Sequence, residues 1–110
     1  MKVQSEEIQE RLSFIDRTID HAARACHSDT NVPSEMKHYV DELGQRASQA
    51  QNALRSRDVG RIRKSVEDLA RISDHAQSTL HPSDGMNYEL KSAVILTHIE
   101  VSALQYQLGR

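Results

Sequence analysis

The stretch AVILTHIEVSAL, residues 93–104, is the most apolar run of the chain and decides its fold. Apolar residues on one side of this segment recur at alternating steps of four and three, the spacing of an amphipathic helix. This stripe consists of Leu90, Val94, Thr97, Val101, Leu104 and Leu108. We therefore expect a C-terminal helix with one side packed in a core.

A second apolar set lies on the other side of the same helix and makes it apolar around most of its circumference. It consists of Ile95, Leu96, Ile99, Ala103 and Tyr106. A helix of this kind is buried either inside its own domain or against a partner. The sequence leaves both options open, and in the first Phe14 and Tyr39 would provide the cover.

Composition predicts an all-α protein with a single domain over residues 1–110. Glycine and proline are scarce, with four and two residues, and leave few positions for turns and strands. The formal net charge of -2, mixed along the chain, gives no field that would recruit nucleic acid or an anionic membrane. His98 and Glu100 interrupt an apolar run already too short to span a bilayer. A single cysteine and no leader-like segment favour the cytoplasm.

Three further helices are expected upstream, over residues 5–27, 34–54 and 59–80, and the last helix should begin near residue 87 or 88. The breaks at 28–33, 55–58 and 81–87 are rich in turn-forming residues. Ser34 and Asp58 are expected N-caps of the second and third helices. Because the connections are short, neighbouring helices should be antiparallel, which gives an up-down four-helix bundle.

Each of these helices carries a stripe with the same rhythm, and the stripes should form the core. The expected core residues are Ile8, Leu12, Ile15, Ile19, Ala22 and Cys26 in the first helix, Met36, Val40, Leu43, Ala47, Ala50 and Leu54 in the second, and Ile62, Val66, Leu69, Ser73, Ala76 and Leu80 in the third.

The chain also resembles itself at a shift of 54 positions. A gapless alignment gives about a dozen identities, where average residue usage would give roughly three or four. They include Arg17-x-x-Asp20-His21 against Arg71-x-x-Asp74-His75, which lie off the core stripes. A shared apolar rhythm does not explain these matches. We therefore interpret residues 5–56 and 59–108 as two copies of one helical hairpin.

The repeated set suggests a pair of candidate contact sites for an anion or a partner. Its members are Arg17, Asp20, His21, Arg71, Asp74 and His75. The interpretation we favour is a solvated salt-bridge cluster, since exposed ion pairs are common and contribute little. No nucleophile accompanies these residues, so the sequence predicts no catalytic site and no enzyme.

A basic cluster at the start of the third helix is a further candidate. Arg61, Arg63 and Lys64 crowd the positive end of the helix dipole, an arrangement that would accept an anion. Aromatic residues are not interleaved with these cations and no recognised motif is present, so we favour a solvated turn over nucleic-acid contact.

The six histidines do not predict a metal site. His21 and His27 are six residues apart, as are His75 and His81, which places each pair on different faces of a helix. Glu35-x-x-His38 is half of a di-iron carboxylate motif, but those bundles need two such motifs and two further glutamates. We expect no metal and no cofactor.

Two functions from different classes follow. The first is a non-enzymatic interaction module that forms a homodimer, or binds a partner helix, through Ile95, Leu96, Ile99, Ala103 and Tyr106. The alternative is a small-ligand or metal-binding four-helix bundle with a regulatory role. The repeat favours the first, because the corresponding residues of the second helix are polar. These counterparts are Asp41, Glu42, Gln45, Gln49 and Asn52.

Overall fold

The computed structural model describes residues 2–28, 32–80 and 88–108, and within these ranges the secondary structure is helical without strands. The helices are α1 (Lys2–Ser28), α2 (Ser34–Arg55), α3 (Val59–Ser78) and α4 (Tyr88–Leu108). The predicted all-α class and the four helices are confirmed. The described part of the chain contains no helix long and apolar enough to cross a membrane.

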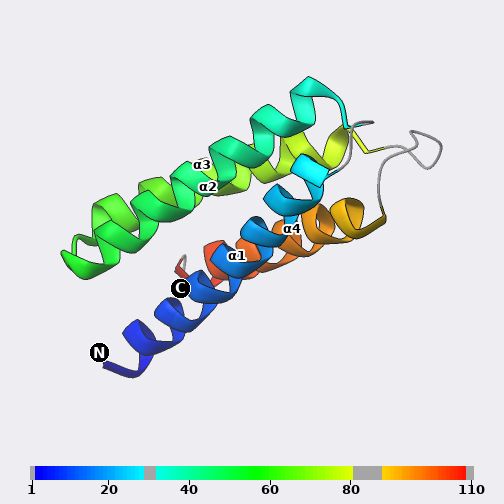
Figure 1. Ribbon diagram of the computed structural model, residues 1–110. Coiled ribbons are helices and arrows are strands. Elements are labelled where there is room, and N and C mark those ends of the chain that lie inside the picture. The colour runs from blue at the N-terminus through cyan, green and yellow to red at the C-terminus, as the bar shows by residue number, and fades with distance from the viewer. Residues whose placement is uncertain (1, 29–31, 81–87, 109–110) are drawn as a thin grey trace.

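The four helices form an elongated bundle in which each helix packs against two neighbours. The contacts join α1 with α2, α2 with α3, α3 with α4, and α4 with α1 (Figure 1). Consecutive helices run in opposite directions, and the α1/α4 pair lies on the other side of the bundle from the α2/α3 pair. This arrangement is consistent with the predicted up-down bundle.

The core is built from the predicted stripes. Leu12, Ile15, Leu43, Leu69 and Leu104 are fully buried in one cluster that involves all four helices. A second cluster lies toward the end of the bundle where α2 and α4 begin; it includes Ala22, Met36, Val40, Leu90 and Val94. On α4 the buried residues are Leu90, Ala93, Val94, Thr97, Val101 and Leu104.

The stripes differ from the prediction at three helix ends. Leu54, Leu80 and Leu108 are only half-buried, and Ala53 is completely buried in place of Leu54. Leu54 and Leu108 are in the last turns of α2 and α4, and Leu80 lies beyond the end of α3. At these ends the stripe therefore leaves the interior.

One of the two predicted N-caps is correct. Asp58 caps α3, and its side chain accepts a hydrogen bond of 3.2 Å from the Arg61 backbone N–H. The prediction for Ser34 is wrong, because Pro33 occupies the N-cap position in an extended conformation and Ser34 is the first helical residue. The backbone N–H of Lys37 bonds to the Pro33 carbonyl, so the hydrogen bonding of α2 begins one residue earlier than expected.

The connections between the helices are short where the structure describes them. Residues 56–58 join α2 to α3, and Arg57 adopts a positive φ of 57° there. The N–H groups of Arg57 and Asp58 bond back to the carbonyls of Leu54 and Ala53, which ends α2 in a Schellman motif. Residues 29–31 and 81–87 of the other two predicted breaks lie outside the described residues.

Candidate functional site

The apolar strip on α4 is the first candidate site. We use this name for Ile95, Leu96, Ile99, Ala103 and Tyr106. Its four large side chains are between 38% and 69% exposed, and Ala103 is half-buried. Because the other side of α4 is buried among α1 and α3, these residues lie on the outer surface of the bundle. The described part of the chain therefore leaves the strip accessible.

Phe14 and Tyr39 do not bury the strip, although they were the expected cover if α4 were buried on all sides within its own domain. Phe14 is itself exposed and lies with Arg11 and Glu100 around a small hollow between α1 and α4. Arg11 and Glu100 form an ion pair of 3.7 Å at this place. Tyr39 lies against His75 of α3, with ring centroids 6.0 Å apart. Phe14 thus adds a further exposed ring to the α1/α4 side of the molecule.

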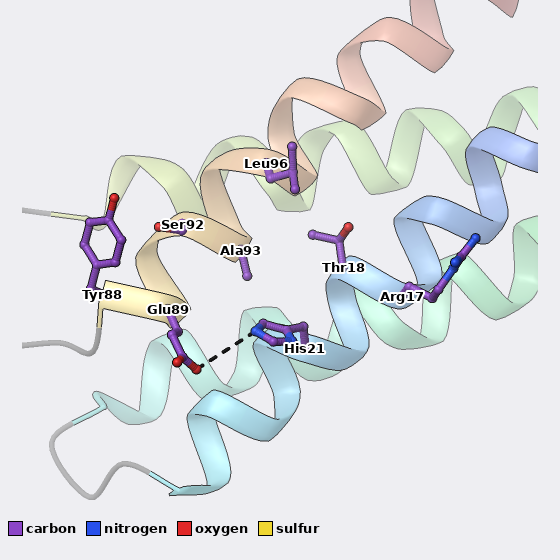
Figure 2. A pocket seen from close by; sticks show the side chains of 8 residues that line it. All are labelled: Arg17, Thr18, His21, Tyr88, Glu89, Ser92, Ala93 and Leu96. Atoms are coloured by element: carbon purple, nitrogen blue, oxygen red, sulfur yellow. Dashed lines mark ion pairs between the residues drawn. The ribbon is translucent and has the colours of Figure 1, made fainter.

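A larger hollow beside the strip is the second candidate site, and we call it the α1/α4 pocket. It has a volume of about 380 Å³. Figure 2 shows its walls, with His21 and Thr18 of α1 on one side and the first two turns of α4 on the other. The lining residues are Arg17, Thr18, His21, Tyr88, Glu89, Ser92, Ala93 and Leu96.

The chemistry of this pocket is mixed. Ala93 contributes only a methyl group to its wall, and Leu96 belongs to both the pocket and the apolar strip. His21 Nε2 lies 4.0 Å from Glu89 Oε2 and bridges the two helices across the mouth of the pocket when the histidine is protonated. The pocket therefore has an apolar floor with polar groups at one end, the usual composition of a small-molecule site.

On the opposite side of the bundle, a tyrosine ring of α2 packs against a histidine of α3. The Tyr39 ring lies against His75 there, and its hydroxyl donates a 3.0 Å hydrogen bond to Glu35 Oε1. This bond, more than partial burial, raises the pKa of Tyr39 above its ordinary value of 10.0. His38 and Glu42 add an ion pair of 2.9 Å on α2.

The structure does not bring the first Arg-x-x-Asp-His set together as a cluster. Arg17 lines the α1/α4 pocket and in Figure 2 its side chain extends away from the centre of the hollow. Asp20 pairs with Arg24 at 2.9 Å, on the exposed surface of α1. His21 faces Glu89.

The second set is also divided among different partners. Arg71 donates to Asp68 at 3.2 Å, and His75 lies against Tyr39. Asp74 Oδ1 lies 3.1 Å from His98 Nδ1 of α4, a distance suited to an ion pair with a protonated histidine although the contact lacks hydrogen-bond geometry. The two sets thus share positions but not contacts.

The basic cluster at the start of α3 is exposed. The backbone N–H of Arg61 donates to Asp58, and the ammonium group of Lys64 lies 3.2 Å from Asp68. Arg63 is exposed. Arg61 and Lys64 are therefore already involved in contacts with carboxylates of the same chain.

Asp68 is a polar core residue that the sequence patterns did not single out. It is 7% exposed and receives both Lys64 and Arg71 on one carboxylate oxygen. The signal was present, since Lys64 and Arg71 lie four residues before it and three after it on one helix. A charged residue beside an apolar stripe is nevertheless normally solvated, so the sequence pattern did not predict that Asp68 is buried.

The described residues contain no group of three or more histidine, cysteine, aspartate or glutamate side chains that could hold a metal ion. Glu35 and His38, the half motif, instead contact Tyr39 and Glu42. Cys26 is buried in the core. His81 lies outside the described residues.

Comparison of the chain with protein-family models, with curated proteins and with solved structures found no match. The apolar strip and the α1/α4 pocket are therefore the two features of the molecule from which we infer a function.

Proposed function

We propose that the protein is a non-enzymatic interaction module that forms an isologous homodimer through the apolar strip of α4. The observation that carries the proposal is the exposure of Leu96, Ile99 and Tyr106 in one row on a helix whose opposite side is core. Contiguous exposed apolar residues on a small domain mark interaction surfaces.

The bundle, in this proposal, is two copies of one hairpin, residues 5–56 and 59–108, related by a pseudo-twofold axis. Two features support the repeat. Helices α2 and α4 begin at Ser34 and Tyr88, which occupy the same position of the repeat. The α1/α2 contact also has its counterpart in α3/α4, and the α2/α3 contact in α4/α1.

The repeat makes the strip conspicuous, because two helices of common origin differ in their outer sides. The counterparts of Leu96 and Ile99 on α2 are Glu42 and Gln45, and the counterpart of Tyr106 is the exposed Asn52. A polar outer side is hydrated in an isolated bundle, whereas an apolar outer side is more stable when it is buried against a second surface.

Burial of the strip would favour a dimer. Complete burial of a large apolar side chain contributes roughly 1.5 to 3 kcal/mol, and each strip residue has part of that still to gain. In an isologous interface every residue contributes twice, once from each copy. A helix of another protein would bury only one copy of the strip, whereas a second copy of this chain buries two, so a second copy is the occupant that we propose.

We also propose a cytoplasmic location, which is consistent with the single buried cysteine.

A matched pair of substitutions tests the dimer. Ile99→Glu places a charge in the middle of the strip, whereas Gln45→Glu places the same charge at the corresponding exposed position of α2. Light scattering coupled to size exclusion should give a folded monomer for Ile99→Glu and a dimer for Gln45→Glu and the wild type. Circular dichroism checks that both variants keep their helices.

The result that contradicts the proposal is equal mass for the two variants. An unfolded Ile99→Glu chain would also contradict it, because an outer residue tolerates charge and a core residue does not.

A further inference from the structure

The contacts of Tyr39 show what kind of group fits the α1/α4 pocket. The phenol ring of Tyr39 on α2 lies against His75 of α3, with ring centroids 6.0 Å apart. Its hydroxyl donates to Glu35, one turn earlier on α2, at 3.0 Å. The phenol therefore contacts an imidazole of the neighbouring helix and a carboxylate of its own helix.

The repeat places the same two partners around the pocket but omits the ring. His21 corresponds to His75 and Glu89 corresponds to Glu35. Both line the α1/α4 pocket and face each other across it (Figure 2). Tyr39 corresponds to Ala93, whose methyl group is all that this position contributes to the wall.

We propose that the α1/α4 pocket binds a small hydroxyaromatic molecule. Its ring lies over Ala93 and against His21, and its hydroxyl donates to the Glu89 carboxylate, as the Tyr39 hydroxyl does to Glu35. Thr18 and Leu96 provide the remaining walls near the ring. The inference rests on the repeat within the proposed function and does not depend on self-association.

The size of the pocket agrees with such a ligand. A volume of about 380 Å³ lies in the range of small-molecule sites, roughly 300 to 1,000 Å³. It exceeds what one ring needs, so the pocket has room for substituents toward Tyr88 and Arg17. Arg17 at the rim, whose side chain extends away from the centre in the structure, would have to turn inward to meet an acidic substituent.

The probe for the test is 4-methylphenol, which is the tyrosine side chain as a free molecule. It is titrated into the wild type and into Ile99→Glu while the amide resonances are followed by NMR. We expect saturable shifts confined to residues around His21, Glu89 and Ala93 in both proteins. Toluene, which lacks the hydroxyl, should bind about fivefold more weakly, because its ring gains no hydrogen bond to the carboxylate.

Ala93→Tyr provides the decisive variant. The new tyrosine side chain would occupy the pocket and lie against His21, as the Tyr39 ring lies against His75. Binding should fall at least about tenfold, a loss of about 1.4 kcal/mol. Gln105→Tyr adds a tyrosine to an exposed position of α4 away from the pocket and should bind as the wild type does.

Tyr39→Ala gives an independent check, since it removes the ring that lies beside His75 and Glu35. This variant should bind a second equivalent of 4-methylphenol, and the probe should raise its melting temperature more than that of the wild type. Should Tyr39→Ala fail to fold, the comparison of Ala93→Tyr with Gln105→Tyr still decides the matter.

The inference is overturned if 4-methylphenol does not bind at millimolar concentration, if Ala93→Tyr binds it undiminished, or if toluene binds equally well. A dimer that does not bind the probe would remove this inference alone. A monomer that binds it would remove the proposed dimer alone.

Discussion

The α1/α4 side and the α2/α3 side of the bundle are each formed by two packed helices, but their surfaces differ. On the α2/α3 side Tyr39 lies against His75 and its hydroxyl is bonded to Glu35. On the α1/α4 side Ala93 is part of the wall of a pocket, and a row of exposed apolar side chains lies next to it. A few side chains therefore give the two sides different surfaces.

The difference teaches that the core and the surface of this bundle are independent. Under the proposed repeat, the buried stripes of α2 and α4 occupy corresponding positions; Met36 and Leu90 are both buried, as are Val40 and Val94. The outer residues of the same two helices differ in polarity without disturbing that packing. A hairpin of this kind can therefore acquire a contact surface without change to its core.

The largest effect is expected when the outer side of α4 is made as polar as the outer side of α2, because the proposed dimer should then dissociate. We predict that Ile95→Asp, Leu96→Glu, Ile99→Gln and Tyr106→Asn, which copy the α2 residues onto α4, abolish association and leave the helix content unchanged. The dissociation constant should rise by more than about a hundredfold, because several apolar side chains per copy no longer become buried. Sedimentation equilibrium measures this change, and a combined variant that still dimerises would show that the interface lies elsewhere.

The second prediction concerns Asp68, which corresponds to Phe14 in the repeat that we propose. Asp68→Asn should lower the free energy of unfolding by about 1 to 2 kcal/mol, because a buried carboxylate that receives Lys64 and Arg71 is replaced by a neutral amide. Asp74→Asn is the matched control; its carboxylate is exposed, so the loss should stay below about 0.5 kcal/mol. Urea unfolding compares the two, and equal losses would contradict a special role for Asp68.

The smallest expected effect is the contribution of Tyr39 to the free energy of unfolding at high pH. Since the folded state raises its pKa above 10.0, the fold favours the neutral phenol. Its contribution to stability is complete below pH 10 and is lost as the pH rises through the folded pKa. Between pH 9 and 11 the wild type should lose slightly more stability than Tyr39→Phe. Identical slopes for both proteins would contradict this assignment.

The sequence predicted the framework well because helical periodicity and turn residues carry most of that information. The stripe of α4 from Leu90 to Leu104 and the Asp58 cap were correct, since both depend on neighbours along one helix. Ser34 failed as a cap because the preceding Pro33 is equally able to occupy an extended N-cap position. Propensity alone does not decide between two adjacent candidates.

The sites depend on contacts between helices, and periodicity does not specify them. The pocket lies between Ala93 of α4 and His21 and Thr18 of α1, and no pattern within α4 indicates a hollow at this place. The repeat that we propose would make Tyr39 the counterpart of Ala93, but the contact of Tyr39 with His75 is seen only in the structure. The burial of Asp68 likewise depended on the arrangement of the neighbouring helices.

The mass of the wild-type protein in solution tests the central claim most directly. Sedimentation velocity from low to high micromolar concentration should show a monomer that converts to a species of twice its mass, with no larger assembly, because an isologous interface is closed by two copies. A protein that stays monomeric at several hundred micromolar would contradict self-association through the apolar strip.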